Sequence, residues 1–575
     1  MITAGGVLLL AGVWLAVTAL MARSQLNQAR AELHTLSAQI SASDWPGARA
    51  TAAGLATHAH NANRLTSGPV WALGAALPSG GEPLKTIRGV TAGLDSLGHS
   101  VLPQLVSASQ RLNPRTLRHP DGTIDLARIA AVAPAFASAS ASLDQTTKTI
   151  IGLPQRTWLS PIDAAYADTL RQVTALNDTL KSADLAARIL PALLGQDGPK
   201  RYFLGFQNEA EARGTGGLPG AFAIIEANRG KLRITRMESD TALYGVAADV
   251  DFGPDYQYLY KGSAPTGYYG NSNLSPNFPY AAQIWASMWK KYSGQKVDGA
   301  IAVDPTALSY LLAVTGPATL PDKSQVSGAN AVALTQATSY AKFAGTSEAE
   351  RTQRRGYLLD VASAVSKRIL DARGEPTAML RAAGKAAGER RLLVWSADPA
   401  LQADLARTSI AGVIPTTKAP YVGLSIVNAG GNKLDYYLDR SLTWQRTGCG
   451  PSRRTIVKIT LTNNAPAGGL PPYVTHRGDK HTYPVKPGDS RLAVSYYATQ
   501  GTVIQSVTVA GRPGTGRIGV ERGHPVYTVD VELPLGTSRT IVLQLIEPAG
   551  TGAPIVLHQP LVRPLLVTLN DAVCN

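Results

Sequence analysis

The longest apolar run in the chain lies at its N-terminus. No charged side chain occurs between Met1 and Ala22, and Arg23 then opens a polar stretch rich in alanine and glutamine. About 20 apolar residues are enough for an α-helix to cross the hydrocarbon core of a bilayer. We therefore expect residues 1–22 to form a transmembrane anchor and no other stretch to span. Leu20-Met21-Ala22 is a poor signal-peptide cleavage site, so the anchor is expected to stay uncleaved.

The pattern after the anchor is helical. Apolar residues recur every three or four positions at Leu26, Ala29, Leu33, Leu36 and Ile40. Further helical segments rich in alanine and leucine follow at about 84–112, 124–151 and 161–194. Because aromatic residues are scarce here, we expect residues 23–197 to form a helical stalk or bundle that acts as a spacer.

The pattern changes at Gly198-Pro199, where short strands begin to alternate with helices. The spacing predicts a glycine-rich loop at 214–220, a hairpin turn at Asn228-Arg229-Gly230, and strands at 200–207, 221–227 and 231–237. Asp304 is placed as the N-cap of one helix, and the predicted helices are Pro279–Tyr292, Thr306–Val314 and Arg351–Leu370. We expect residues 198–412 to form a central α/β domain.

The C-terminal region has an all-β pattern. From Tyr421 onward, short runs of Val, Ile, Leu and Tyr are separated by turns of Gly, Pro and Asn. This spacing favours an immunoglobulin-like β-sandwich over residues 421–575. The whole chain is thus predicted to be a multidomain α+β protein.

The cysteines and charges bear on the compartment. Arg23 and Arg30 follow the anchor, which alone would favour a cytoplasmic body. The only two cysteines are Cys449 and Cys574, as expected of one disulfide in an exported protein. We therefore expect a single-pass membrane protein whose bulk is extracytoplasmic, with a disulfide that ties the first turn of the β region to its last strand.

The net charge of the 575-residue chain is +15. Basic residues do not alternate with aromatic ones in any run, so nucleic acid is not an expected partner. Outside the membrane, the counter-charges are lipid headgroups, polyprenyl phosphates and anionic wall polymers. A basic surface that only aids solubility also fits.

Two basic elements of the central region are candidates for anion binding. Asn208, Glu211 and Arg213 precede the turn Gly214–Gly217, where backbone N–H groups could approach a phosphate. The alternative is a strand-edge turn with a structural ion pair. The second element is a helix face that carries Arg351, Arg354 and Arg355. The alternative for this face is an ordinary solvated surface.

Other motifs carry little chemistry. Gly514–Gly519 matches G-x-G-x-x-G but lies between two predicted strands, without the helix that a dinucleotide site needs. His58 and His60 are two residues apart on a helix, so they face different directions and make a poor metal pair. These motifs therefore do not identify the ligands of a metal site.

Several strings resemble a known bacterial family. RYFLGFQNEAEARGTGGLPGAFAIIEANRGKL, SPNFPYAAQIW, VDGAIAVDPTALSYLLAVTGP and NKLDYYLDR, which cover most of 198–450, closely resemble the family called domain of unknown function 4012. The resemblance implies an anchored envelope protein associated with exopolysaccharide production. It implies no established chemistry.

A more distant resemblance is to the LytR-CpsA-Psr family, whose enzymes move glycopolymers from polyprenyl pyrophosphate to the wall. The resemblance implies a LytR-CpsA-Psr-like fold for the central domain. It also implies that Asp240 is a catalytic acidic residue with Mg²⁺ as the cofactor. The residues that would bind phosphate are Arg213, Arg351, Arg354 and Arg355. The chain departs from that family at two places. Its Arg-Ser-Asp is here Arg213-Gly214-Thr215, and its Pro-Arg-Asp is Glu238-Ser239-Asp240.

Two functions from different classes fit these residues. One is binding of a lipid-linked or wall glycopolymer, with assistance in its transfer or export. The other is a non-catalytic scaffold or adaptor for exopolysaccharide or envelope assembly. Loss of the acidic residue at Thr215 favours binding over metal-assisted transfer.

Overall fold

The computed structural model describes the chain over most of its length. The described ranges are 2–42, 44–78, 80–111, 117–119, 121–372 and 376–572, apart from the side chains of 2–9, 37, 41–42, 45, 106, 109–111 and 376–377. Within them the chain divides into two compact units, Met1–Asp197 and Gly198–Asn575. The architecture is mixed, with helices in the first unit and helices and sheets in the second.

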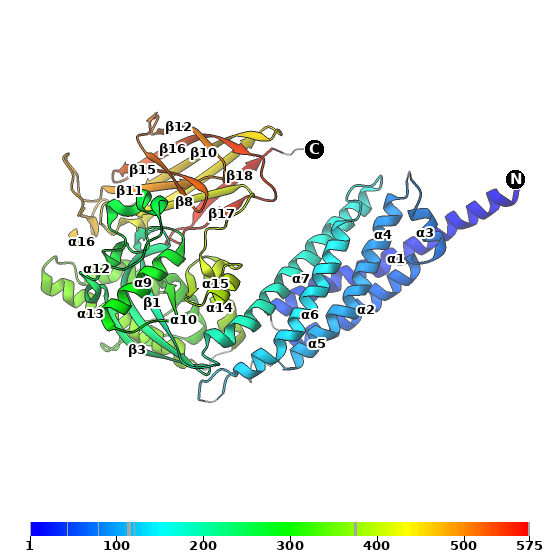
Figure 1. The fold of residues 1–575 in the computed structure, drawn as a ribbon, viewed down its shortest axis with the longest axis horizontal. Coiled ribbons are helices and arrows are strands. Elements are labelled where there is room, and N and C mark those ends of the chain that lie inside the picture. The colour runs from blue at the N-terminus through cyan, green and yellow to red at the C-terminus, as the bar shows by residue number, and fades with distance from the viewer. Residues whose placement is uncertain are drawn as a thin grey trace. The chain divides into compact units, whose positions relative to one another are not determined.

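The first unit is a bundle of long helices (Figure 1). A π-helical turn, Leu97–Val101, joins two of them. The helices are α1 (Ile2–Ala42), α2 (Trp45–Thr66), α3 (Pro69–Ala75), α4 (Glu82–Ser96), α5 (Leu102–Arg111), α6 (Leu126–Ile151) and α7 (Ser160–Leu193). Asp44 caps α2 by accepting a hydrogen bond from the backbone N–H of Gly47 at 3.1 Å, as expected for an N-cap.

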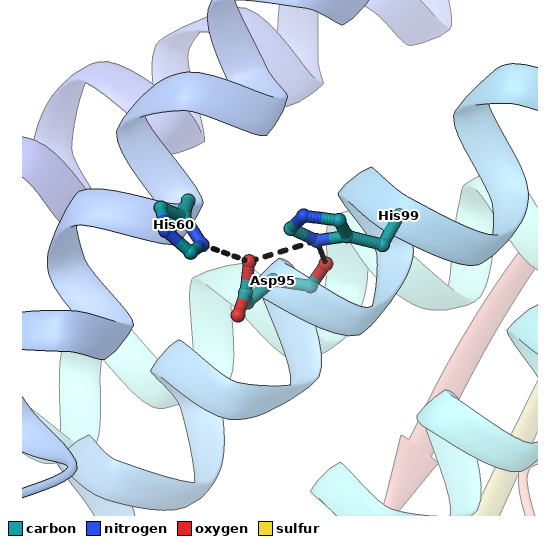
Figure 2. Close-up of side chains that lie close together, drawn as sticks. All are labelled: His60, Asp95 and His99. Atoms are coloured by element: carbon teal, nitrogen blue, oxygen red, sulfur yellow. Dashed lines mark hydrogen bonds and ion pairs between the residues drawn. The ribbon is translucent and has the colours of Figure 1, made fainter.

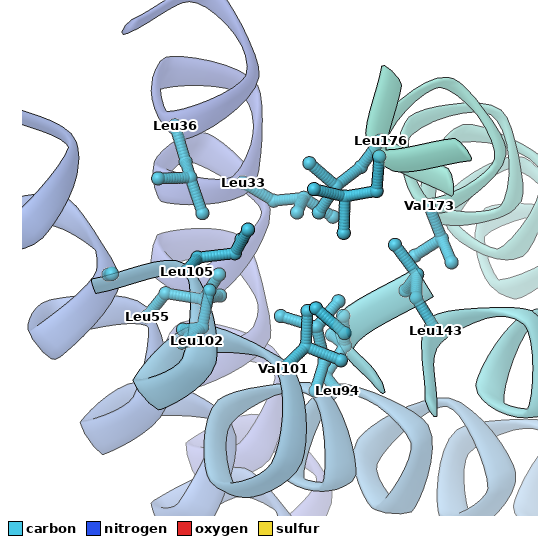
Figure 3. Close-up of a cluster of buried hydrophobic side chains, with 14 of the residues drawn as sticks. Leu33, Leu36, Leu55, Leu94, Val101, Leu102, Leu105, Leu143, Val173 and Leu176 are labelled. Carbon is cyan, nitrogen blue, oxygen red and sulfur yellow. The ribbon is translucent and has the colours of Figure 1, made fainter. Parts of the chain in front are cut away.

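The bundle has one continuous apolar core. Leu33, Leu55, Leu94, Leu143 and Leu176 come from five different helices and are completely buried together (Figure 3). The heptad-like recurrence of leucine and alanine places one apolar stripe of each helix against the others. Burial of these stripes holds the first unit together.

The described part of the predicted anchor, residues 2–22, belongs to α1. The side chains of residues 1–9 lie outside the described part, so the anchor stays a prediction. Among the described residues, α6 is long and apolar enough to cross a membrane by length and composition. The sequence pattern did not predict this candidate. Because Val132, Phe136 and Leu143 of α6 pack into the bundle core, the same composition also serves a core helix.

The second unit contains a five-stranded sheet in the order β3-β2-β1-β4-β7. β1 pairs antiparallel with β2 and parallel with β4. The strands are β1 (Lys200–Arg213), β2 (Gly216–Asn228), β3 (Lys231–Ser239), β4 (Gly299–Val303) and β7 (Leu392–Ser396). A separate two-stranded ribbon is formed by β5 (Ala318–Thr319) and β6 (Gln325–Val326).

Helices cover both faces of this sheet. Phe203 packs with Trp285 of α9, whereas the next residue of β1, Leu204, packs with Ala307 of α10 and Ala386 of α14. Successive residues of a strand point to opposite faces, so both faces of β1 are buried. The helices are α8 (Pro254–Tyr260), α9 (Phe278–Ser293), α10 (Pro305–Thr315), α11 (Ala331–Ala333), α12 (Ser339–Lys342), α13 (Glu348–Asp371), α14 (Pro376–Gly388) and α15 (Pro399–Leu405).

Local predictions in this region are mostly confirmed. Asp304 caps α10 through a hydrogen bond from the N–H of Ala307 at 2.7 Å. Arg229 and Gly230 both have positive φ, as a tight hairpin requires. The loop predicted at 214–220 is wrong, because β2 already begins at Gly216 and pairs with Arg213.

Two further sheets form the C-terminal part of this unit. Their apolar faces share one core, in which Ile426 and Val494 of one sheet meet Trp444 and Ile459 of the other. The first sheet has the order β13-β12-β16-β10-β9-β18 and the second β14-β15-β11-β8-β17. The strands are β8 (Tyr421–Asn428), β9 (Leu438–Thr447), β10 (Ser452–Asn463), β11 (Ser490–Tyr497), β12 (Val503–Val509), β13 (Arg512–Pro513), β14 (Arg517–Glu521), β15 (His524–Leu533), β16 (Ser538–Pro548), β17 (Ile555–Leu557) and β18 (Leu565–Asp571), and a short helix, α16 (Pro472–Thr475), precedes β11.

The predicted disulfide involves Cys574, which lies outside the described residues. The described register ends nearby, with Asp571 of β18 paired in parallel with Arg446 of β9. Three residues beyond each member of that pair the sequence has Cys449 and Cys574. The disulfide stays a prediction.

Candidate functional site

The charged residues predicted near the end of β1 are buried. Arg213 and Glu211 are each 5% exposed, and they form an ion pair at 3.0 Å. Arg213 Nε donates to the carbonyl of Gly270 at 3.0 Å, and its terminal nitrogens donate to Glu211, Asn271 and two backbone carbonyls. Each nitrogen of this guanidinium therefore has an acceptor within the protein.

Glu211 also pairs with Lys433, which comes from the segment after β8. Burial alone would raise the pKa of Glu211, but the charges of Lys433 and Arg213 outweigh it and lower the pKa below its usual value. The carboxylate stays ionised in the interior. These three residues form a structural charge network between the central sheet and the C-terminal sheets.

The glycine turn after Arg213 is closed rather than open to a ligand. A Cβ on Gly214 would lie 2.1 Å from the carbonyl oxygen of Leu274, and one on Gly217 would lie 2.1 Å from the backbone of Asn208. Asn273 Nδ2 donates to the carbonyl of Gly217 at 2.9 Å. The glycines are needed because backbone segments approach each other closely here.

Asn208 is also engaged within the protein. Its Nδ2 donates to the hydroxyl of Tyr340, and its Oδ1 accepts from the N–H of Ala210 at 3.0 Å. Asn208, Glu211 and Arg213 thus lie together on β1, but all three face partners inside the second unit.

The three arginines of α13 have different surroundings. Arg354 is 3% exposed, donates to the carbonyl of Phe343 at 2.8 Å, and places its guanidinium 3.4 Å from the centre of the Tyr473 ring. Arg351 and Arg355 both pair with Glu348 and remain accessible. Of the predicted arginine face, only these two can meet a ligand without rearrangement.

Asp240 lies at the start of a short 3₁₀ turn, Asp240–Leu243, directly after β3. Its carboxylate accepts a hydrogen bond from the Tyr244 hydroxyl at 2.9 Å. Burial raises the pKa of Asp240 above its usual value, while the Tyr244 hydroxyl and the positive charges of Arg355 and Lys433 act against that rise. Asp240 is therefore within electrostatic reach of both Arg355 and the buried network.

Two partly exposed tyrosines complete this region. Tyr244 is 48% exposed and Tyr268 is 38% exposed, and their ring centroids are 5.9 Å apart. Burial and then the charge of Asp240 raise the pKa of Tyr268. We call Asp240, Tyr244, Tyr268 and Arg355 the Asp240 site. It offers one carboxyl group, one guanidinium and two aromatic faces with hydroxyl groups.

The Asp240 site contributes one carboxylate, and it is not part of a group of three metal-ligating side chains among the described residues. The group of three metal-ligating side chains found in the described part of the chain is His60, Asp95 and His99, in the first unit (Figure 2). Spacing in the sequence sets His60 beside His58 alone and gives no indication of Asp95 and His99 as its partners. The signal available was the i, i+4 spacing of Asp95 and His99, but their nearness to His60 depends on helix packing.

Comparisons with known proteins give one match. No curated protein and no solved structure matches the chain significantly. The predicted likeness to the LytR-CpsA-Psr family is therefore not shown. Residues 197–340, which contain β1–β6 and three of the four residues of the Asp240 site, match the model of the family described as "Protein of unknown function (DUF4012)".

Proposed function

We propose that the chain is a membrane-tethered envelope protein that binds an anionic glycopolymer, free or linked to a polyprenyl phosphate, at the Asp240 site. The observation that carries this proposal is that the Tyr244 hydroxyl, at the end of the 3₁₀ turn, donates to Asp240 at its start, while the accessible Arg355 lies within electrostatic reach on α13, which packs against β3. Guanidinium groups pair with phosphate and carboxylate. Tyrosine rings and hydroxyls suit the apolar faces and hydroxyl groups of sugars.

The resemblances support the same reading. The order of a hairpin, Asp240, a helix and an arginine-bearing helix follows the LytR-CpsA-Psr family, whose members act on lipid-linked glycopolymers. An immunoglobulin-like arrangement of the two C-terminal sheets would add a second surface for recognition. The match to the DUF4012 family agrees with the first of the two resemblances on which the proposal rests.

Binding is the primary activity in this proposal, and transfer is secondary. A transferase needs groups that stabilise charge developing on the phosphate. At the Asp240 site, Arg355 can supply such charge, and burial raises the pKa of the Asp240 carboxyl above its usual value. The single carboxylate favours binding over metal-assisted transfer. A protein that only binds would act as the non-catalytic scaffold of the alternative function.

The first unit supports the membrane tether. In α1 the side chains of Leu10, Trp14 and Leu20 are 69%, 58% and 66% exposed. Within the same stretch of α1, Thr18 is buried and accepts a hydrogen bond from Trp71 Nε1 at 2.9 Å. An exposed apolar helix face of this kind is stabilised when lipid covers it.

The binding proposal is tested with an Arg355→Ala variant of the full chain in detergent micelles. The probe is a polyprenyl pyrophosphate-linked glycan, and its binding is measured by microscale thermophoresis. Arg351→Ala is the matched control, because it removes the same charge from the same helix one turn away and contacts the same Glu348. We expect Arg355→Ala to weaken binding by about tenfold or more, equivalent to about 1.4 kcal/mol for one charge-assisted contact.

Equal binding by wild type and Arg355→Ala would refute the Asp240 site as the binding surface. Equal loss in both variants would show that only overall charge matters. An Asp240→Asn variant separates the two activities: it should keep binding but abolish any transfer of the glycan to an acceptor.

A further inference from the structure

We propose that His60, Asp95 and His99 form a zinc-binding site on the helical unit. Each residue offers one ligand atom, and these atoms all lie within 4.8 Å of one another. Figure 2 shows the two imidazole rings on either side of the Asp95 carboxylate, with His60 from α2, Asp95 from α4 and His99 from the π-helical turn that follows. The proposal is independent of the Asp240 site, which lies in the other unit.

The distances suit a tetrahedral ion. His60 Nδ1 lies 3.3 Å from Asp95 Oδ1, and His99 Nδ1 lies 3.0 Å from the same oxygen. With metal–ligand bonds of about 2.0–2.1 Å, two ligands of a tetrahedral zinc ion are separated by about 3.3 Å. The ligand atoms are therefore close to the spacing of a tetrahedral site, and on binding the metal His99 Nδ1 would give up its present contact with the Asp95 carbonyl oxygen at 2.9 Å.

The helix packing fixes the two histidine-bearing segments against each other. Gly98, next to His99, is buried, and a Cβ there would lie 3.0 Å from the Cα of Ala56 on α2. The side chains of Leu97 and Val101 on the same turn are completely buried. Because glycine lets the turn approach α2 closely, His60 and His99 are held near each other by the bundle core. π-helical turns are rare and often occur at functional sites.

A supporting residue orients the carboxylate. Asn63, on α2 three residues after His60, donates from Nδ2 to Asp95 Oδ2 at 2.7 Å. This bond leaves Oδ1 directed at the two imidazoles. Hydrogen bonds from residues around a metal site commonly fix the ligands in this way.

The donor set and its exposure favour zinc. Two imidazole nitrogens and one carboxylate oxygen suit Zn²⁺ better than Mg²⁺ or Ca²⁺, which prefer oxygen ligands. The side chains of His60 and His99 are 48% and 63% exposed. An ion can therefore enter from solvent and keep water in its remaining coordination position, as in zinc sites with three protein ligands.

The alternative is an ordinary surface cluster of histidines around a carboxylate. His58 provides the comparison, because its Nδ1 pairs with Glu32 at 2.9 Å as a two-residue contact between α2 and α1. A metal site needs all three ligands at once, whereas a cluster of ion pairs does not. The two cases predict different effects of single substitutions on metal binding.

The test uses the full chain, purified in detergent with a tag that contains no histidine. Bound metal is removed with a chelator, and Zn²⁺ is then added in isothermal titration calorimetry. Co²⁺ substitution gives a visible absorption spectrum that reports coordination number. We expect one equivalent of Zn²⁺ to bind and Co²⁺ to give the intense bands of a four-coordinate site.

Single variants identify the ligands. His60→Ala, Asp95→Asn and His99→Ala should each weaken Zn²⁺ binding by at least about 100-fold, and Asn63→Ala by about tenfold. His58→Ala is the matched control and should bind as wild type. Far-ultraviolet circular dichroism checks that each variant keeps its helices, which is expected because the histidines are half exposed.

Three outcomes would overturn the proposal. The first is no binding by the wild type at 100-fold molar excess of Zn²⁺. The second is unchanged binding after loss of His60 or His99 with helicity retained. The third is an equal loss in His58→Ala, which would show nonspecific association with surface histidines.

Discussion

The most informative test of the second unit is the removal of Arg391, which neutralises two buried carboxylates. Its Nη1 lies 2.5 Å from Glu209 Oε1 and 3.0 Å from Asp304 Oδ2, and both acidic residues are completely inaccessible to solvent. Its Nη2 donates to the carbonyl of Leu561 at 2.9 Å, so the same side chain joins the central sheet to the C-terminal sheets. We choose Arg391→Met, which keeps much of the volume and removes the charge.

The expected loss follows from the two buried acidic groups left without a counter-ion. Breaking a buried ion pair by removing one partner costs about 3–5 kcal/mol, because the remaining charge has neither water nor a counter-ion. Burial and then the charge of Glu209 already raise the pKa of Asp304 well above its usual value, even with Arg391 present. Without Arg391 that pKa rises further. A carboxyl whose pKa is raised by folding stabilises the fold below its unfolded pKa and loses that contribution as pH rises, so the defect of Arg391→Met grows from pH 4 to pH 8.

Hydrogen–deuterium exchange measured by mass spectrometry reports this loss for the second unit alone. Amides in the middle of β1 should exchange about 150- to 5,000-fold faster in Arg391→Met, the equivalent of 3–5 kcal/mol at about 1.36 kcal/mol per tenfold. Arg407→Met is the control. Its side chain is 72% exposed and pairs with Asp404 at 3.7 Å, so exchange should change by about fivefold or less.

A result in which Arg391→Met exchanges no faster than Arg407→Met would refute the reasoning. A triple variant decides the cause of a real loss. Adding Glu209→Leu and Asp304→Asn removes both unpaired acidic groups, and asparagine can still accept the capping hydrogen bond at the start of α10. We expect this variant to recover most of the protection. No recovery would assign the loss to the missing carbonyl contact and to packing.

Three other predictions follow from the same unit. Gly217→Ala should lower the midpoint of thermal unfolding by many degrees, because the new Cβ would lie 2.1 Å from backbone atoms, whereas at Gly220 the nearest neighbour is 4.0 Å away and Gly220→Ala should be nearly neutral. Burial raises the pKa of Asp435 to about 6, so the stability that this carboxyl contributes is present below pH 3.8 and is lost as the pH rises through 6. The free energy of urea unfolding of Asp435→Asn should lack that decline. A variant with the same pH profile as the wild type would contradict the prediction. Cys449 and Cys574 should resist thiol labelling in the exported protein until a reductant is added, and labelling before reduction would exclude the disulfide.

The sequence predicts a feature correctly when the residues that determine it are close together in the sequence. The cap at Asp304 and the turn at Arg229-Gly230 are confirmed, because each depends on residues within four positions. The loop predicted at 214–220 failed because its glycines read as a flexible turn. They are required instead by pairing with β1 and by contact with Leu274, about 60 residues away in the sequence.

Ion pairs and metal ligands follow the same rule. Arg391 meets Glu209 and Asp304 across long sequence separations, so no spacing in the sequence indicates the network. His60 was compared with its nearest histidine, whereas its structural partners are on α4 and the turn after it. Helical periodicity predicted the bundle and its apolar faces. It did not determine which polar positions of neighbouring helices would meet.

The most distinctive string in the sequence is therefore largely structural. The stretch from Asn208 to Gly217 combines charges and glycines in a way typical of phosphate sites, yet Arg213 and Glu211 are buried and paired with each other. A ligand that reached Arg213 would have to displace Glu211 and expose the buried Lys433. An accessible charge that needs no such rearrangement is available at Arg355, which lies within electrostatic reach of Asp240. Functional tests of this chain should therefore begin with Arg355 and treat variants of Arg213 as tests of folding.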